Sequence, residues 1–314
     1  MMDAGEGDAR EGMDVVSRSQ CGGVKTHICF FAPFLKGEHF AGNETVSHDL
    51  LSPIHEAAVY ELDKMLWMLA TPLPISPIFK VPLLFGNAAS IHACYTPPNP
   101  IPDTQETNKY GYKVNSNFRF KLVRRIGAGA KAFHWFYAAS ESAIILANAF
   151  PSELSTNVLS TLMRHPERVS ALRITPGWLI GSALMASGAL IRMACYRELG
   201  RFFTWELSLR KDQNLVTTGP YSIVRHPSYT GTTLATIGTF ICQIGAGTWM
   251  AESGWFELTS VRVLYAIWLA YSAYIPWMMI WRTYAEDQVL REQFPEEWNA
   301  WARRTPYKLI PYIF

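Results

Sequence analysis

Charged residues are scarce in this sequence. Only 17% of its 314 residues are Asp, Glu, Lys or Arg, against about 25% in an average soluble domain. The formal net charge is +2, and no basic stripe with interleaved aromatic residues is present, so a nucleic-acid partner is not expected. Hydrophobic residues reach 49% and aromatic residues 13%. Low charge combined with this apolar content indicates a membrane protein.

Paired cysteines and nucleotide-binding glycines are also missing. The five cysteines form no C-x-x-C pair and no metal-ligand spacing with histidine, so we expect free, buried thiols and no metal site. They are Cys21, Cys29, Cys94, Cys195 and Cys242. The glycines at 127–129 lack the third glycine of a dinucleotide-binding motif and follow no predicted strand. The sequence therefore excludes a soluble enzyme with a Rossmann fold.

The N-terminal region lacks the features of a secretory signal peptide. It begins with the acidic, Gly-rich "MMDAGEGDAREGMD", and the apolar run 27–35 is too short to cross a bilayer. We expect residues 1–60 to form a poorly ordered extension. The apolar residues of the stretch 54–70 fall on one helical face, which predicts an interfacial helix. These are Ile54, Ala58, Met65, Leu66 and Leu69.

Long apolar runs occur in the rest of the chain. The segments 131–150, 174–196, 229–250 and 261–281 each have the length of about 20 residues that a bilayer crossing requires. A fifth segment, 81–95, is short, and three prolines near it argue against one straight helix. The pattern predicts an all-α, polytopic membrane helix bundle with about five transmembrane helices.

Lysine and arginine are distributed unevenly between the loops. The connections 96–130 and 197–228 and the C-terminal tail are rich in Lys and Arg, whereas 251–260 has neither. Basic loops remain on the cytosolic side of a membrane. We therefore expect these three regions in the cytosol, and the glycosylation sequon at Asn43 on the lumenal side.

The stretch "LVTTGPYSIVRHPSYTG" (215–231) places basic residues at the mouth of an apolar segment. Gly219-Pro220 predicts a turn, and Pro227 suits the first turn of a helix. The free N–H groups there would form an anion site that Arg225 and His226 reinforce. By spacing alone, anchoring at the lipid headgroups explains these two residues equally well.

A second polar group follows the last apolar segment, in "WRTYAEDQVLREQF". Arg282 and Glu286 have the i, i+4 spacing that places both on one helix face. The alternative is a surface ion pair of little energetic value. An apolar face continues beyond the membrane, and the tail 306–314 is expected to dock. The face comprises Leu290, Phe294, Trp298 and Trp301.

The motifs "LVTTGPYSIVRHPSYTG" and R-x-x-x-E-D-x-x-L-x-x-x-F, followed by "PYKLIP", resemble the isoprenylcysteine carboxyl methyltransferase family. Its members are integral-membrane enzymes that use S-adenosyl-L-methionine to methylate the C-terminal prenylcysteine carboxylate of processed CaaX proteins. The resemblance covers about 173–314 and implies a methyltransferase core there, preceded by membrane helices and loops over 61–172. It also implies a multi-pass protein of the endoplasmic reticulum membrane with a cytosolic C-terminal catalytic cap.

The resemblance also implies roles for individual residues. It assigns the S-adenosyl-L-methionine site to Gln213, Asn214, Leu215, Val216, Tyr221, His226, Pro227, Ser228, Tyr229 and Glu286. Arg282 corresponds to the family's substrate-facing arginine and is the expected catalytic residue. The chain departs from the family pattern where Asp287 replaces the second of two glutamates and where Gln213-Asn214 precede Leu215. Trp298 and Trp301 stand where tyrosines are common.

Transfer of a methyl group to a carboxylate requires no general base, because the carboxylate is already ionised at neutral pH. Arg282 would orient it, and a prenyl chain would enter laterally from the lipid bilayer. Three alternatives remain open. They are the same fold acting on a phospholipid amine or a small lipid-like (terpenoid) acid, an NADPH-dependent membrane reductase of the sterol reductase type, and a non-catalytic scaffold.

The Arg-His-Pro triplet occurs a second time, in "MRHPERV" (163–169). This copy lacks the preceding turn and is followed by Glu167-Arg168 instead of an apolar helix. The charge pattern of the loops places it on the lumenal side. We interpret the second triplet as a coincidence in a loop.

Overall fold

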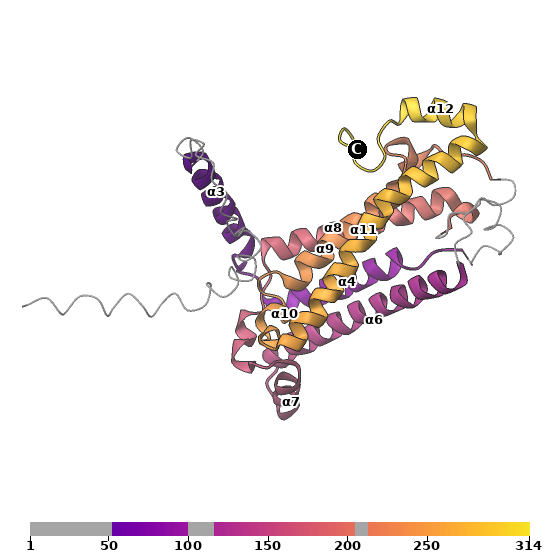
Figure 1. Cartoon of the computed structure of the whole chain (residues 1–314). Coiled ribbons are helices and arrows are strands. Elements are labelled where there is room, and N and C mark those ends of the chain that lie inside the picture. The colour runs from indigo at the N-terminus through magenta and orange to yellow at the C-terminus, as the bar shows by residue number, and fades with distance from the viewer. Residues whose placement is uncertain (1–51, 100–115, 205–212) are drawn as a thin grey trace, which may run out of the picture. The chain divides into compact units, whose positions relative to one another are not determined.

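The computed structural model describes residues 52–99, 116–204 and 213–314, and all regular structure in these ranges is helical (Figure 1). The predicted all-α fold is thereby confirmed. The chain divides into two compact units, Met1–Val59 and Tyr60–Phe314, and the description below concerns the second. The α-helices are α3 (Ser52–Ala70), α4 (Lys80–Cys94), α6 (Ser116–Ala149), α7 (Glu153–Leu162), α8 (Pro176–Leu199), α9 (Pro227–Ile244), α10 (Trp249–Glu252), α11 (Thr259–Gln293) and α12 (Pro295–Arg304).

Among the described residues, three helical segments are long and apolar enough to cross a membrane: Pro176–Phe202, Pro227–Glu252 and Thr259–Gln293. They correspond to three of the predicted crossings and confirm the polytopic membrane bundle. The other two predicted segments, 81–95 and 131–150, lie in α4 and α6. The total of five crossings and the side on which each loop lies stay predictions.

The prolines before α4 interrupt the chain as expected. Helix α3 ends at Ala70, and a non-helical stretch leads to the short 3-10 helix η1 (Pro77–Phe79). Helix α4 begins at the next residue, Lys80. The predicted helix over 54–70 is therefore present, whereas its location at a membrane surface stays a prediction. Asn43 lies outside the described residues.

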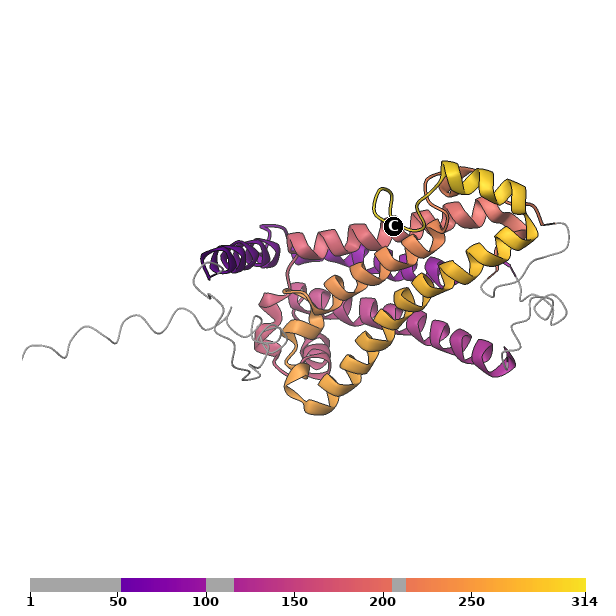
Figure 2. The same cartoon turned by 45° about the horizontal axis from the view of Figure 1, so that its top comes forward.

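Helices α8 and α9 run side by side over most of their length (Figure 2). Glycines on both helices allow this close approach. A Cβ atom on Gly188 would lie 2.4 Å from the carbonyl oxygen of Gly231, and one on Gly238 would lie 2.4 Å from that of Gly181. Small residues at such a contact allow the backbones of two membrane helices to meet directly.

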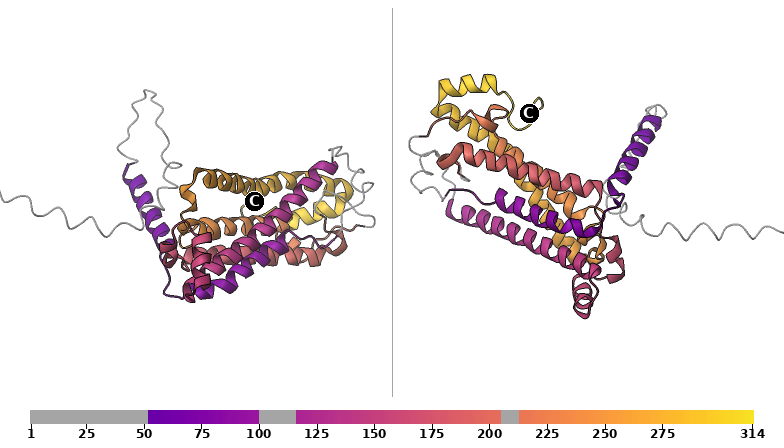
Figure 3. Two further views of the ribbon diagram at one scale, coloured as in Figure 1. Left: turned by 90° about the horizontal axis from the view of Figure 1, so that it is seen from below. Right: turned by 180° about the vertical axis from the view of Figure 1, so that it is seen from behind.

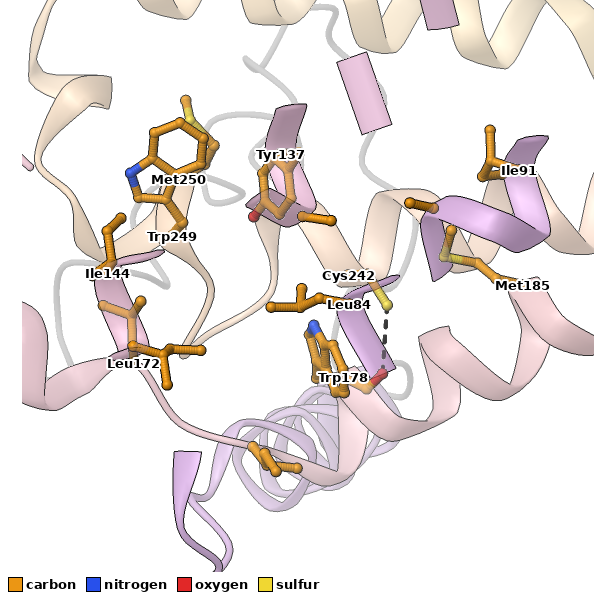
Figure 4. Packing of buried hydrophobic residues seen from close by; sticks show 14 of the residues in the cluster. Leu84, Ile91, Tyr137, Ile144, Leu172, Trp178, Met185, Cys242, Trp249 and Met250 are labelled. Atoms are coloured by element: carbon orange, nitrogen blue, oxygen red, sulfur yellow. Dashed lines mark hydrogen bonds between the residues drawn. The ribbon is translucent and has the colours of Figure 1, made fainter. Parts of the chain in front are cut away.

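Helix α4 lies between α6 and α8 (Figure 3). The buried side chains of these helices form the main hydrophobic core together with residues of α9 and α10 (Figure 4). Its members include Leu84, Ile91, Tyr137, Ile144, Leu172, Trp178, Met185, Cys242, Trp249 and Met250. Cys94, Cys195 and Cys242 are buried and free, as predicted; Cys21 and Cys29 lie outside the described residues.

A smaller core lies where the C-terminal part of α8 meets α12. Cys195, Tyr221 and Trp301 are buried in it, and Leu290 and Trp298 pack against it. The apolar residues predicted on one face after the membrane are thus mostly internal. They do not share one helix, because the chain turns at Phe294, where φ is −130° and ψ is 62°. This turn brings α12 back against the residues that precede α9, where Trp301 donates to the carbonyl of Tyr221 and Thr305 to that of Ser222.

Candidate active site

The start of α9 has the predicted local structure. Gly219 has a φ of +57° and opens the 3-10 turn η4 (Gly219–Ser222), a backbone conformation that glycine adopts without strain. His226 is the N-cap residue of α9, and Pro227 occupies its first turn. The proline fits because an N–H at this position would have no partner within the helix.

The C-terminal tail docks onto the residues just before α9, as predicted. The backbone N–H of Arg225 donates to the carbonyl of Tyr307 at 2.9 Å, and that of His226 donates to the carbonyl of Lys308 at 2.8 Å. The hydroxyl of Thr230 donates to the carbonyl of Leu309 at 2.7 Å. These bonds differ from the expected anion site, because the tail carbonyls already occupy two of the N–H groups at the helix mouth.

Arg225 is buried, and its guanidinium is bound by groups inside the protein. Its Nη1 atom donates to the carbonyls of Thr305 and Pro306 at 2.9 and 2.8 Å, and its Nη2 atom lies 3.2 Å from Asp287 Oδ2. Arg225 therefore links the loop before α9, the tail and α11. Of the two interpretations that the sequence left open for this residue, these internal contacts argue against headgroup anchoring.

The structure brings four predicted site residues together, His226 and Tyr229 from the start of α9 and Arg282 and Glu286 from α11. The rings of His226 and Tyr229 stack at 8° with their centroids 5.7 Å apart. The hydroxyl of Tyr229 donates to Glu286 Oε2 at 2.6 Å. Arg282 Nε lies 4.0 Å from the same oxygen, and the guanidinium lies 6.0 Å from the Tyr229 ring. The predicted i, i+4 pair of Arg282 and Glu286 is present.

The remaining predicted residues lie next to this group. Leu215 and Val216 pack against the smaller core, where the carbonyl of Tyr221 accepts a hydrogen bond from Trp301 Nε1 at 3.0 Å. Burial, followed by the nearby Cys195 and the charge of Glu286, raises the pKa of Tyr221 well above its usual value. Ser228 is buried behind the helix mouth. Gln213 is half-buried and Asn214 exposed at the beginning of the same segment.

The sequence interpretation gave no role to Asp287, which is the centre of a buried ionic cluster. His226 Nε2 lies 2.9 Å from Asp287 Oδ1, and Arg225 and Lys308 lie 3.2 and 3.6 Å from Oδ2. Lys308 Nζ also lies 3.3 Å from the centroid of the Tyr284 ring. Burial lowers the pKa of Lys308, and the charge of Asp287 opposes this shift. The adjacent acidic residues in the sequence were the available signal.

Arg192 was also missed. It is only 3% exposed, and its Nη1 atom donates to the carbonyl and hydroxyl of Ser228 and to the hydroxyl of Thr232 at 3.1, 3.0 and 2.6 Å. An arginine within the apolar run "ALIRMACY" was the signal, because charges inside membrane segments are rare and mark functional positions.

The second Arg-His-Pro triplet joins two loops at another place in the fold. The backbone N–H groups of Arg164 and His165 donate to the carbonyl of Ser253 at 2.9 and 3.2 Å. His165 Nε2 lies 2.9 Å from Glu257 Oε2, and its Nδ1 lies 3.1 Å from Glu167 Oε1. The triplet therefore stabilises a loop contact, in keeping with a role separate from the candidate site.

Comparison with known proteins identifies relatives of the C-terminal half. The family model for phospholipid methyltransferases matches residues 176–297, a range that contains both motifs of the site. Protein-S-isoprenylcysteine O-methyltransferase B of Arabidopsis thaliana is 24% identical over 164 residues, which are 49% of this chain and 73% of the relative. A probable protein-S-isoprenylcysteine O-methyltransferase of Oryza sativa subsp. indica is 23% identical over 189 residues, 59% of this chain and 87% of the relative.

A third relative carries a different kind of name. The nickel-cobalt-cadmium resistance protein NccN of Alcaligenes xylosoxydans xylosoxydans is 37% identical over 129 residues, 40% of this chain and 50% of the relative. Within the described ranges, no group of three or more His, Cys, Asp or Glu side chains is placed to hold a metal ion. The methyltransferase matches agree with the order of the two motifs and with the helical membrane fold. The C-terminal part of the chain is thus similar to membrane methyltransferases, among them the isoprenylcysteine methyltransferases that its motifs indicated.

Proposed function

We propose that this protein transfers a methyl group from S-adenosyl-L-methionine to the carboxylate of a lipid-linked acceptor, the C-terminal prenylcysteine of a processed CaaX protein. The observation that carries the proposal is the group formed by His226, Tyr229, Arg282 and Glu286 at one end of the membrane bundle. Its residues come from both sequence motifs. The similarity to methyltransferases supports methyl transfer, and the cofactor and the acceptor are part of the proposal.

The side chains present fit S-adenosyl-L-methionine, which supplies a methyl group on a sulfonium when bound. Glu286 keeps 29% of its side chain exposed although it pairs with Tyr229, so its carboxylate can also accept from the ammonium group of the cofactor. The turn from Val216 to Tyr221 lies against the same region and would contact the ribose. The other predicted contacts, Gln213 to Leu215 and His226 to Ser228, complete this cofactor site.

The charges around the site favour an anionic acceptor. In the described part of the chain, six charged side chains contact the start of α9 or one another beside it, four positive and two negative, which leaves two positive charges in excess. They are Arg192, Arg225, Arg282, Lys308, Glu286 and Asp287. An excess of positive charge in a partly buried site attracts a carboxylate and opposes the approach of an amine in its cationic form.

In this proposal Arg282 binds that carboxylate. Its side chain is 26% exposed, and a guanidinium can hold a carboxylate by two parallel hydrogen bonds. Such a pair orients the reacting carboxylate oxygen, and no proton is transferred between the two groups. In-line placement and removal of water supply the remaining acceleration, because the acceptor needs no general base.

The lipid part of the acceptor would approach along α11. Trp277, Trp281 and Tyr284 are 59%, 63% and 51% exposed on this helix, close to Arg282 in the sequence. Aromatic side chains of this kind are typical of the interface between hydrocarbon and water. A multi-pass location in the endoplasmic reticulum membrane with a cytosolic site is part of this proposal.

A phospholipid amine is the second candidate acceptor, because the matching family model is that of the phospholipid methyltransferases. This reaction needs a neutral amine, so a nearby base or a lowered amine pKa is required. A carboxylate-binding Arg282 would have no role in it. The two candidates therefore differ in their dependence on this arginine.

The test is methyl transfer by the purified full chain in lipid nanodiscs. Labelled S-adenosyl-L-methionine is offered with N-acetyl-farnesylcysteine, with phosphatidylethanolamine or with a free terpenoid acid. We expect transfer to the prenylcysteine, loss of at least about 100-fold in Arg282→Ala, and normal activity in Arg262→Ala. Arg262 is an exposed residue at the other end of the same helix. Transfer to the amine or the terpenoid acid without transfer to the prenylcysteine would refute the acceptor assignment.

A further inference from the structure

Asp287 connects three parts of the candidate site. Its Oδ1 atom faces His226 Nε2 at 2.9 Å, and its Oδ2 atom faces Arg225 Nη2 at 3.2 Å and Lys308 Nζ at 3.6 Å. These partners come from the helix mouth and from the tail, whereas Asp287 belongs to α11. We propose that Asp287 is a positioning residue that fixes the orientation and the tautomer of His226 for cofactor binding. The proposal rests on the function proposed above.

The ionic surroundings determine which atoms of His226 can donate. A carboxylate next to two cations is ionised and only accepts hydrogen bonds, so the proton of a neutral imidazole must reside on Nε2. The Nδ1 atom then carries a lone pair, and it lies 4.0 Å from Glu286 Oε2. Two acceptors face each other across this gap. A ligand ammonium or amino group between them, which carries at least two hydrogens, could donate one hydrogen bond to each.

The ring of His226 is held in this orientation from two sides. Its face stacks on Tyr229, whose hydroxyl is bonded to Glu286. Stacking alone would also permit the imidazole to flip by about 180° around its bond to Cβ, which exchanges the two ring faces. The bond from Nε2 to Asp287 permits only one of these two orientations. Asp287 thereby acts on the cofactor through His226 and does not need to touch it.

Asp287 also neutralises the cations that hold the tail. Arg225 binds the carbonyls of Thr305 and Pro306, and the backbone of Lys308 accepts from His226. Without the carboxylate, two positive charges would remain close together in a buried place, which is unfavourable. A test must therefore separate the effect on His226 from an effect on the tail.

The experiment measures binding of S-adenosyl-L-methionine to the full chain in nanodiscs by equilibrium titration. Asp287→Asn keeps the size of the side chain and removes its charge. We expect a loss of affinity of about 10- to 100-fold, as for one charge-assisted hydrogen bond. The rate at saturating cofactor should change by less than about threefold, since the group does not touch the reacting atoms. Asp287→Glu should restore affinity to within about threefold.

A double-mutant cycle with His226→Gln isolates the coupling. If Asp287 acts through His226, Asp287→Asn should have little further effect on affinity in the His226→Gln background. His226→Gln alone should lower affinity to a similar extent and leave the tail in place. The affinity of His226→Gln alone can be measured even where Asp287→Asn yields no folded protein.

Thr230→Val is the matched control for the tail. It removes the hydrogen bond to Leu309 and leaves His226 and Asp287 untouched. Hydrogen exchange of the Arg225 and His226 amides, followed without cofactor, reports tail docking. Exchange should accelerate in Thr230→Val and in Asp287→Asn, whereas affinity should fall strongly only in the second.

The outcomes separate the two proposals. If the wild type neither binds S-adenosyl-L-methionine nor transfers methyl groups, the proposed function itself fails. If the wild type does both, the positioning role is refuted by any of three results. These are unchanged affinity in Asp287→Asn, additive effects in the cycle with His226, and an equally large loss of affinity in Thr230→Val.

Discussion

The contact between α8 and α9 allows a quantitative prediction for Gly188→Ala. The new Cβ atom would lie 2.4 Å from the carbonyl oxygen of Gly231 and 2.8 Å from the backbone nitrogen of Ala235. Carbon and carbonyl oxygen normally stay about 3.3 Å apart, so the helices must separate locally by roughly 0.9 Å. Both neighbouring atoms belong to the backbone and cannot rotate away. We expect a loss of about 1–3 kcal/mol in stability, as for overpacking in a tight core.

The displacement also reaches the candidate site. Gly231 lies in the second turn of α9, one turn after His226 and next to Arg192. A shift of this turn lengthens the 2.9 Å contact between His226 and Asp287. We therefore expect Gly188→Ala to weaken cofactor binding as well as to lower the melting temperature, at roughly 2–4 °C per kcal/mol.

Gly86→Ala in α4 is the matched control, because a Cβ atom there would have no heavy atom within 4 Å. Alanine is favoured over glycine inside a helix by roughly 0.5–1 kcal/mol, so this variant should be as stable as the wild type or slightly more stable. Thermal unfolding in nanodiscs measures both variants. Equal melting temperatures for the two would show that α8 and α9 do not pack through their glycines.

Two further predictions concern ionic groups away from the site. Lys80 and Glu141 form a fully buried pair with 2.5 Å between Nζ and Oε1. Glu141→Gln should therefore lower the free energy of unfolding by about 3–5 kcal/mol, measured by thermal unfolding. The double variant Lys80→Met with Glu141→Leu should recover much of this loss. The hydrogen bond from His165 lowers the pKa of Glu257 below its ordinary 4.5, so this contact contributes stability above pH 4.5 that is lost as the pH falls further. Hydrogen exchange at 253–257 should accelerate in that range in the wild type and be independent of pH, once corrected for intrinsic exchange, in Glu257→Gln.

The local structure of the site follows closely from the sequence. Gly219-Pro220 predicted a turn and Pro227 a helix start, and both are present, because these residues restrict the backbone by themselves. The pair of Arg282 and Glu286 was also predictable, since helical periodicity alone determines which residues share a face. The length and apolar character of the segments likewise indicated three of the membrane helices.

The contacts that assemble the site could not be derived in this way. Asp287 meets Arg225 and His226 only because the chain turns at Phe294 and the tail returns to the helix mouth. No local pattern encodes that return, which joins residues some 80 positions apart. Arg225 shows the consequence: at a helix mouth it has the pattern of a headgroup anchor, and its partners are three interior oxygens.

The two Arg-His-Pro triplets show what distinguishes a site from a loop contact. In both, backbone N–H groups of Arg and His donate to carbonyls, and the Nε2 atom of the histidine lies 2.9 Å from a carboxylate. The His165 side chain is 29% exposed, and its two ring nitrogens are both taken by carboxylates. His226 is 4% exposed, stacks on Tyr229 and keeps one nitrogen directed towards Glu286 without a hydrogen bond to it. In the second triplet both histidine nitrogens are therefore paired with carboxylates, whereas in the first the Nδ1 atom lies 4.0 Å from its nearest carboxylate, and this difference arises from α11 and the tail.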